Sequence, residues 1–444
     1  MTNVFSHLSF DGTMVIDPAE TAFAATDFGG IVGYPPLAVL RARSTADIEA
    51  VLPVAAANNI SVVPRGCGHT SLGQAQALDG LVIDLTALDE VHDLTEDQVT
   101  VDAGATWNSL LAHTLQYGLT PRVLTDYLGT SIGGTLSAGG IGGTSHRYGV
   151  QTDNALALDV VTADGATRHC SPTELPDLFH AVLGGFGQCG VIVRATLPLI
   201  PAPARVRRVK VYYPTIDELV ANQRSLLAEG RFDFLQGEIL PTPGGWVYML
   251  DVASYYTPPH EPYDDVLASG IGFVASRDKI EDLTYWEFAT RLDETVTYLE
   301  GTGEWETPHP WPNLLLPDAE LDAFTSGIMA DLEHADMGAS GLILLYPMTT
   351  AAFGTPLFRL PEGSTIYLVA GLRFATDAAK AQDMVTKNRR WYDAAVSVGG
   401  TSYPTGAIPF TSADWTRHLG TAQAVLAEAK ARYDPSNLFP RRFA

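Results

Sequence analysis

A glycine-rich stretch between residues 129 and 143 limits what this chain can fold into more than any other feature. Seven of its fifteen residues are glycine, and glycine loses more conformational freedom on folding than any other residue. A long stable helix or a well-packed strand interior is therefore excluded here. Because backbone without side chains can lie directly against a ligand, we expect this stretch to line a binding site.

Two more glycine-rich stretches lie next to predicted strands, at residues 64–74 and 183–190. Closely spaced glycines after a strand let backbone N–H groups approach an anion such as a diphosphate. Residues 64–74 lack the dinucleotide fingerprint, because Ser71 occupies the third glycine position, and they lack the Gly-Lys-Ser/Thr of a Walker loop. An anion-binding loop and an ordinary turn both fit this pattern, and His69 within it could be reactive or a plain loop histidine.

Two other residues have both a functional and a structural interpretation. Asp126 precedes the glycine-rich stretch in a mostly apolar neighbourhood, which fits either a desolvated general base or a solvated, capping carboxylate. Trp311 lies in the rigid segment 308–313 and could form the wall of a pocket or pack in the core. The residues alone leave both pairs of alternatives open.

The charge balance of the chain limits the classes of partner that it is expected to bind. The 444 residues include 27 Lys and Arg against 51 Asp and Glu, a formal net charge of −24. Nucleic acids and anionic membrane surfaces both attract basic patches, so neither is an expected partner, and we expect a small-molecule substrate that is neutral, cationic or apolar. The three cysteines have spacings that indicate neither a disulfide framework nor a metal site.

The N-terminal residues and the composition predict a location. Residues 1–18 lack the basic and apolar regions of a secretory signal, and no apolar run approaches the ~20 residues that span a bilayer. We therefore expect a soluble, cytoplasmic protein. The excess of Arg (22) over Lys (5), together with abundant Ala, is typical of proteins from GC-rich bacterial genomes.

The order of the predicted elements indicates a mixed α+β fold. Short strands and helices alternate up to about Pro203. Ser44 with Asp47 resembles a helix N-cap followed by an acid in the first turn, and residues 107–117 predict an amphipathic helix that stops at Gly118. Longer helices separated by strands follow, such as 216–229 and 379–396. The last forty residues are again loop and helix. We therefore predict three parts, 1–203, 204–403 and 404–444.

Taken in order, these stretches resemble flavin oxidoreductases of the vanillyl-alcohol-oxidase and p-cresol-methylhydroxylase type, and within that superfamily the cytokinin dehydrogenases. The glycine motifs are typical of the superfamily, whereas the His-Pro-Trp segment and its neighbours resemble the cytokinin group. The resemblance extends over nearly the whole chain. The matching residues are 65–70 with Gln74, 125–128 with 133–137, 183–188, 247–256, 308–311 with Asn313, 345–348 and 433–435.

The resemblance implies FAD as the cofactor, bound across residues 1–203 as a PCMH-type FAD-binding domain. Residues 204–403 would form the substrate-binding cap over the isoalloxazine ring, and residues 404–444 would return to the first domain. His69 stands where the family joins a histidine covalently to the flavin methyl at C8, and no cysteine is placed for a second link. The implied cofactor-binding residues are Arg65, Gly66, Cys67, Gly68, His69, Thr70, Gln74, Asp126, Ser131, Gly134, Ser137, Ile141, Ile192 and Tyr403.

The resemblance also implies a reaction, the oxidation of a secondary amine at its C–N bond by an FAD-linked oxidase or dehydrogenase. A hydride passes from carbon to flavin N5, Asp126 accepts the amine proton, and the imine hydrolyses to an amine and an aldehyde. The electrons then pass to O₂ or another acceptor.

The family pairs this aspartate with a glutamate, and here Gln236 takes the place of that glutamate. A glutamine can hydrogen-bond the aspartate but cannot share a proton with it. Glu238, two residues on, is expected on the same face of the strand. We therefore assign Asp126 and Gln236 to catalysis and place Glu238, Trp311 and Asn313 in the substrate pocket.

Three functions remain open at this stage. The first is a cytokinin dehydrogenase whose substrate is adenine with an isoprenoid side chain on N6. The altered Gln236 leaves room for the second, a flavin oxidase for another amine or alcohol, for example in bacterial secondary metabolism. The third is a flavin-carrying binding protein without turnover, which the retention of both His69 and Asp126 disfavours.

Overall fold

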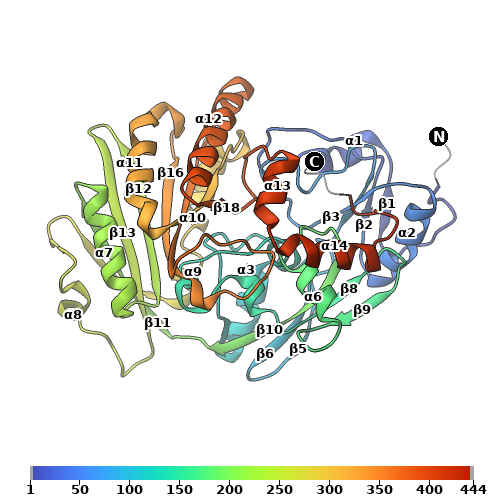
Figure 1. The fold of residues 1–444 in the computed structure, drawn as a ribbon. Helices are drawn as coiled ribbons and strands as arrows, with labels where there is room; N and C mark the ends of the chain where they lie inside the picture. The colour runs from blue at the N-terminus through green and yellow to red at the C-terminus, as the bar shows by residue number, and fades with distance from the viewer. Residues whose placement is uncertain (1–3, 441–444) are drawn as a thin grey trace.

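The computed structural model of the chain describes residues 4–440, and within them the strands form three sheets (Figure 1). Residues 1–3 and 441–444, which belong to the first and last predicted parts, lie outside the described residues. Between residues 4 and 440, no helix combines the length and the apolar character needed to cross a membrane. The mixture of helices and sheets agrees with the α+β fold class.

The first sheet has the strand order β1-β2-β4-β3, in which β2, β4 and β3 run parallel. Helix α2 (Thr45–Ala57) connects β2 to β3, and Ser44 and Asp47 form the capping box at its start. Ligands of such sheets bind beyond the carboxyl ends of the parallel strands, and the loop 66–74 begins at that end of β3. The strands are β1 (Thr13–Val15), β2 (Ala38–Arg41), β3 (Val62–Arg65) and β4 (Leu81–Asp84).

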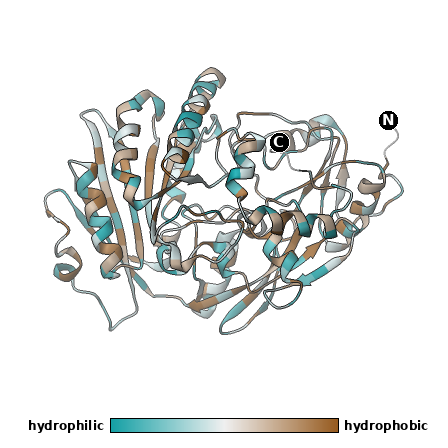
Figure 2. Ribbon diagram, viewed as in Figure 1, coloured by the Kyte–Doolittle hydropathy of each residue, from teal (hydrophilic) through white to brown (hydrophobic). Residues whose placement is uncertain are grey.

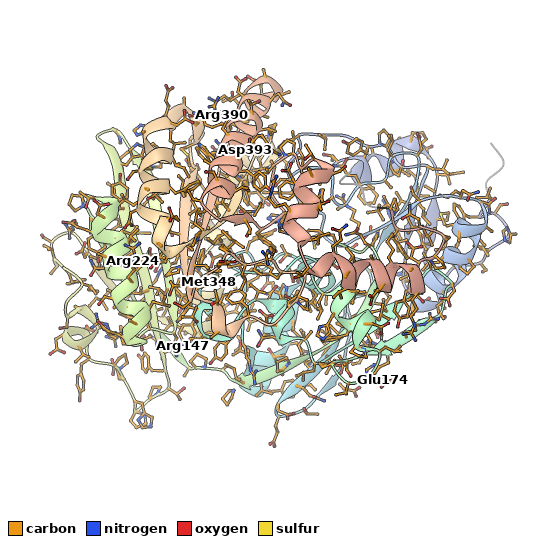
Figure 3. All side chains as sticks on the ribbon, in the orientation of Figure 1. Arg147, Glu174, Arg224, Met348, Arg390 and Asp393 are labelled. Carbon is orange, nitrogen blue, oxygen red and sulfur yellow. The ribbon has the colours of Figure 1, made fainter. Side chains whose placement is uncertain are left out.

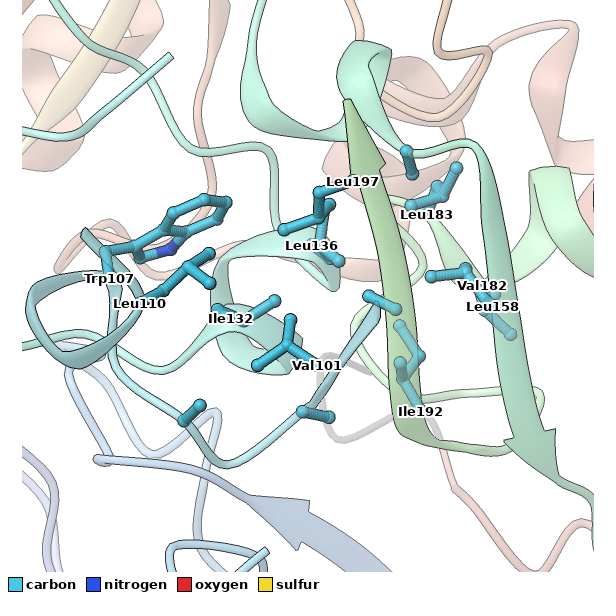
Figure 4. Close-up of a cluster of buried hydrophobic side chains, with 14 of the residues drawn as sticks. Val101, Trp107, Leu110, Ile132, Leu136, Leu158, Val182, Leu183, Ile192 and Leu197 are labelled. Atoms are coloured by element: carbon cyan, nitrogen blue, oxygen red, sulfur yellow. The ribbon is translucent and has the colours of Figure 1, made fainter. Parts of the chain in front are cut away.

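The second sheet is antiparallel, with the order β5-β6-β10-β8-β9 and β7 paired to β10. Its core supports the glycine-rich stretch 129–143, which contains the short helix α4 (Ile132–Leu136). Trp107 packs in this core with Ile132 and Leu136 of the helix (Figure 4). Its indole N–H donates to Thr135 Oγ1 at 2.9 Å. The strands are β5 (Val91–Leu94), β6 (Gln98–Asp102), β7 (Leu119–Pro121), β8 (Ala157–Val161), β9 (Thr167–Cys170) and β10 (Val191–Pro201).

The third sheet has eight antiparallel strands in the order β14-β11-β13-β12-β16-β17-β15-β18. The turn between β10 and β11, residues 202–204, contains the predicted boundary at residue 203, and the division into three parts stays a prediction. The strands are β11 (Arg205–Tyr213), β12 (Phe234–Thr242), β13 (Gly245–Tyr256), β14 (Lys279–Thr284), β15 (Asn313–Pro317), β16 (Leu342–Thr349), β17 (Thr365–Leu372) and β18 (Thr401–Ser402).

Helices cover one face of the third sheet. Helix α7 (Ile216–Glu229), helix α11 (Leu321–Asp331) and helix α12 (Ala378–Ser397) share one apolar core with alternate strand residues. Figure 2 shows brown strand segments behind these helices. Arg224 on α7 and Arg390 on α12, labelled in Figure 3, pair with Asp318 and Asp331 near the two ends of α11. Because strand residues alternate between faces, the other face of this sheet carries the remaining, more polar set, and that face borders the site.

Shorter helices complete the chain. The C-terminal helix α14 (Ala422–Tyr433) packs on helix α6 (Pro176–Val182). Tyr433 Oη donates to Asp177 at 3.0 Å there. The predicted helix from Trp107 to Tyr117 is α-helical only to Thr114, and a 3₁₀ turn carries it to its expected end at Gly118. The remaining helices are α1 (Pro18–Thr21), α3 (Trp107–Thr114), α5 (Ser145–Tyr148), α6 (Pro176–Val182), α8 (Asp264–Ala268), α9 (Tyr285–Ala289), α10 (Asp293–Thr302), α13 (Ser412–Leu419) and α14 (Ala422–Tyr433).

Candidate active site

A cavity of about 410 Å³ lies between the polar face of the third sheet and the glycine-rich loops. All but one of the residues predicted for the site line it. The exception is Arg65, which is buried beneath the loop and donates from its guanidinium to the carbonyl oxygens of Thr26 (2.7 Å) and Ala75 (3.2 Å). The lining residues are Gly66, Cys67, Gly68, His69, Thr70, Gln74, Asp126, Ser131, Gly134, Ser137, Ile141, Ile192, Gln236, Glu238, Trp311, Asn313 and Tyr403.

Two loop glycines are required by close contacts. A Cβ at Gly66 would lie 1.8 Å from Ser131 Oγ, and one at Gly68, whose φ is +68°, would lie 2.3 Å from Arg65 Nη2. Within residues 4–440, the backbone N–H groups of Gly66, Gly68 and His69 form no hydrogen bond with the protein. The loop therefore offers free donors over a buried guanidinium.

His69 is held between aromatic rings. Its imidazole stacks on Phe28 at a centroid distance of 4.0 Å and on Tyr127 at 5.0 Å. Burial, with a further contribution from His309, lowers the pKa of His69 to about 3. The ring is therefore neutral at pH 7, and one of its nitrogens keeps a free lone pair.

Asp27 anchors the loop that carries His69. Its Oδ2 accepts hydrogen bonds from Thr70 Oγ1 at 2.9 Å and from the backbone N–H of Gly73 at 2.7 Å. Burial raises the pKa of Asp27 to about 6, despite these bonds and the nearby Arg65. Sequence reasoning gave Asp27 no role.

Asp126 is bound by one donor on each carboxylate oxygen. Arg291, two residues after α9, donates from Nη2 to Oδ1 at 2.5 Å, and Tyr346 on β16 donates from its hydroxyl to Oδ2. The Arg291 guanidinium lies over the rings of Phe234 and Phe288, 4.8 and 4.7 Å from their centroids. An arginine fixed in this way holds the carboxyl group in one position.

The Tyr346 hydroxyl connects Asp126 to Gln236. The Tyr346 hydroxyl lies 3.1 Å from Gln236 Oε1, and Gln236 Nε2 donates to Glu238 Oε1 at 3.0 Å. Burial, followed by the charges of Asp251 and Asp126, raises the pKa of Glu238 to about 7. The site therefore contains two carboxyl groups with different environments, connected by a phenol and an amide.

The backbone brings these distant residues together at the end of the glycine-rich stretch. The backbone N–H of Leu235 on β12 donates to the carbonyl of Gly143 at 3.1 Å, and a Cβ at Gly143 would lie 2.1 Å from the ring of Phe234. Arg147, labelled in Figure 3, bridges the same elements through Asp233 at 2.6 Å. This contact places Gln236 beside the segment that holds Asp126.

Much of the remaining cavity wall is apolar. Trp311 is fixed in it by a hydrogen bond from Nε1 to the carbonyl of Arg373 at 2.9 Å, and Asn313 Nδ2 donates to Thr405 Oγ1 at 3.2 Å. Side chains from β16, β17, α10 and the neighbouring segments complete this wall. They are Leu292, Val296, Leu299, Trp305, Leu342, Leu344, Leu368, Ala370, Leu372 and Phe374.

Sequence reasoning missed the cationic part of the site. Arg291 carries no motif, and its place beside Asp126 depends on tertiary packing alone. Arg208, which also lines the cavity, could have been found, because strand alternation places it on the same face as Asp251 across the register of β11 and β13. Tyr346 lies in a segment that matched the family but was given no role.

The loops fit a dinucleotide cofactor such as FAD. The free N–H groups of Gly66, Gly68 and His69, over the buried Arg65, suit a diphosphate. The glycines leave room for a ligand to contact the backbone, and the cavity continues from there past His69 to Asp126. These residues would hold the cofactor with its reactive ring near His69.

Comparisons with known proteins agree with this assignment. Residues 36–171 match the family described as "FAD binding domain", and residues 240–441 match "Cytokinin dehydrogenase 1, FAD and cytokinin binding". The chain is 40% identical, over 94% of its length and 95% of the relative, to "Uncharacterized oxidoreductase ORF5 in fasciation locus" from Rhodococcoides fascians. It is 34% identical to cytokinin dehydrogenase 10 of Oryza sativa subsp. japonica (94% of this chain, 86% of the relative) and 32% identical to cytokinin dehydrogenase 3 of Arabidopsis thaliana (98% and 90%).

Proposed function

We propose, from the premise that this chain belongs to the cytokinin dehydrogenase family of FAD-linked oxidoreductases, that it oxidises the C–N bond of an N6-isoprenoid adenine. The observation that carries the proposal is the environment of Asp126, a carboxylate fixed by Arg291 and Tyr346 at the side of a largely apolar cavity. When bound, FAD supplies the hydride acceptor at N5. The roles described below are those of side chains of this protein.

Asp126 is the proton acceptor of the proposed reaction. Because a neutral amine loses its hydride more readily as its nitrogen sheds a proton, a carboxylate near that nitrogen assists the oxidation. When Asp126 gains the proton, the Tyr346 O–H can turn from Asp126 Oδ2 to Gln236 Oε1, 3.1 Å away. Tyr346 therefore stays hydrogen-bonded in both protonation states of the base.

His69 is the proposed covalent link to the flavin methyl at C8. Its support is the neutral imidazole, whose lone pair makes it a nucleophile at pH 7. Stacking between Phe28 and Tyr127 fixes the ring in the cavity wall, so the imidazole would meet the flavin in one orientation.

The polar and apolar side chains of the cavity suit the two halves of the proposed substrate. The isoprenoid chain would lie against Leu342, Leu368 and Phe374, where burial of apolar surface favours binding. The purine would lie beside Asp126 and Glu238, whose groups can hydrogen-bond its nitrogens. Trp311 and Asn313 complete the wall of the pocket.

An anaerobic reduction experiment tests the proposal. The purified yellow protein is mixed with isopentenyladenine, and the flavin absorbance band is followed. We expect rapid bleaching, with adenine and 3-methyl-2-butenal as products. A flavin that dithionite reduces but isopentenyladenine does not would contradict the substrate assignment.

Gln236 favours a second candidate, a flavin oxidase for another amine or alcohol. The cytokinin dehydrogenase pattern has a glutamate at this place, so the change could reflect a different substrate. A panel of secondary amines and primary alcohols distinguishes the two, because only the first candidate predicts preferential bleaching by isopentenyladenine.

A further inference from the structure

The charged groups around Asp126 and Glu238 are balanced without Glu238. Arg291 pairs with Asp126 at 2.5 Å, and Arg208 Nε donates to Asp251 Oδ1 at 2.8 Å. On the neighbouring strands, Lys210 lies 3.4 Å from Glu281. Every cation facing this part of the cavity therefore already has a carboxylate partner.

Glu238 is the carboxyl group left over. It faces Arg208 and Tyr212 from β11, Asp251 from β13, Tyr346 from β16, and Asp126 with Arg291 from the opposite wall. Within residues 4–440, no cation forms an ion pair with it. A charge added here would have no counter-ion, so the neutral acid is favoured, in agreement with the pKa of Glu238 raised to about 7.

Gln236 fixes the orientation of this acid. Its Nε2 donates to Glu238 Oε1, so the second oxygen, Oε2, is the one that carries the proton. Within residues 4–440, Oε2 forms no hydrogen bond, and Glu238 lines the cavity. An O–H group is therefore available to a ligand.

The amide of Gln236 also separates the two carboxyl groups. It accepts from Tyr346 through oxygen and donates to Glu238 through nitrogen. A proton arriving on Asp126 cannot pass through an amide in this arrangement as it could through a carboxyl group. Glu238 therefore does not share a proton with Asp126 through Gln236.

We propose that Glu238 is a specificity-determining residue that binds the substrate as a neutral carboxylic acid, donating its O–H to a lone-pair nitrogen of the substrate's heteroaromatic ring. This inference rests on the proposed function, because it takes an adenine-type ring as the ligand. Deprotonation of Glu238 removes the donor and places an anion against the ring nitrogen, so binding weakens as the pH rises.

Adenine is the probe, because it has the ring but no side chain to oxidise. Its dissociation constant is measured with the flavin-loaded enzyme, by calorimetry and by the flavin spectrum, from about pH 6 to about pH 8.5. For the wild-type protein we expect the constant to rise about tenfold for each pH unit above 7. For Glu238→Gln, which keeps an N–H donor at every pH, we expect a constant that changes less than about twofold.

Glu300→Gln is the matched control, because Glu300 is an exposed carboxyl group on α10 and its change should leave the wild-type slope intact. A wild-type dissociation constant that is flat or falls with rising pH, or an adenine that does not bind at any pH, would overturn the inference without needing any variant. A Glu238→Gln protein that keeps the wild-type slope would also overturn it.

Failure of the proposed function gives a different pattern. If isopentenyladenine does not reduce the flavin but adenine binds with the expected slope, the proposed reaction is wrong and the role of Glu238 stands. If the flavin is reduced but the slope is absent, the reaction stands and the role of Glu238 is wrong.

Discussion

Replacing Arg291 by Met tests whether the guanidinium holds the Asp126 carboxyl group in place. Methionine fits between the rings of Phe234 and Phe288, where Arg291 now lies, because its flexible thioether packs well against aromatic groups. The substitution therefore removes the charge and preserves most of the packing. Both members of the ion pair are largely buried, with 10% and 15% of their side chains exposed, so water screens their attraction only weakly.

The size of the effect follows from the geometry. With charge centres about 4 Å apart and an effective dielectric constant of about 20, the attraction is about 4 kcal/mol. Water can enter beside the shorter Met side chain and replace part of this attraction, so we expect about 2.7 kcal/mol of it to be lost. Because the carboxyl group then loses its fixed position beside the substrate, flavin reduction at pH 7 should slow by about a hundredfold.

Anaerobic stopped-flow reduction with saturating isopentenyladenine is the assay. Arg291→Lys keeps the charge but loses the planar fork, and we expect a loss of less than about tenfold. A wild-type rate for Arg291→Met, or an equal loss of rate for Arg291→Met and Arg291→Lys, would refute the role assigned to this ion pair.

Three further predictions concern the loop that carries His69. After precipitation in acid, the yellow colour should stay with the wild-type protein and move to the supernatant for His69→Ala; colour in the supernatant of both would remove the covalent link. Gly66→Ala should lower flavin content severely, because its Cβ would lie 1.8 Å from Ser131 Oγ, whereas full flavin content would contradict the tight contact. Burial raises the pKa of Asp27 from 3.8 in the unfolded chain to about 6 in the folded protein. The contribution of Asp27 to the free energy of unfolding is therefore fully present below pH 3.8 and is lost as the pH rises through 6. Above pH 6 this costs the wild type up to about 3 kcal/mol, so Asp27→Asn should flatten the pH dependence of thermal unfolding between pH 4 and 7, and an unchanged profile would contradict the burial argument.

The glycine-rich loops were predictable because their cause is local. Seven glycines in residues 129–143 exclude a long helix whatever surrounds them, and the structure contains only the five-residue helix α4 there. The same holds for helix α2, whose start at Ser44 follows from a capping residue and an acid three residues later. Local chemistry also explains the small error in α3, whose last turn tightens to 3₁₀ geometry before Gly118.

The hydrogen-bond network of the site was not predictable, because it depends on tertiary packing. Asp126, Gln236, Arg291 and Tyr346 come from four separate segments, and no spacing in the sequence shows that Arg291 and Tyr346 take the two oxygens of Asp126. Alternation on β12 correctly places Glu238 on the face of Gln236, as their 3.0 Å contact requires. It could not show that Tyr346 lies between Gln236 and Asp126, because that depends on the pairing of β12 with β16.

The hydrogen-bond network gives a physical reason for the glutamine at position 236, where the family pattern has a glutamate. A glutamate there would lie beside Tyr346 and Glu238, and with Asp126 it would place three carboxyl groups near the guanidinium of Arg291, since Arg208 is held by Asp251. Like charges in one site force some of them to stay protonated. A neutral amide at position 236 removes that competition and leaves one base and one acid, Asp126 and Glu238. Two residues along a strand move a side chain by about 7 Å on the same face, so the carboxyl group that the family places beside its aspartate lies farther along the cavity here. A substrate that contacts both Asp126 and Glu238 must reach past the Tyr346 and Gln236 side chains that connect them, which a purine with its exocyclic nitrogen can do.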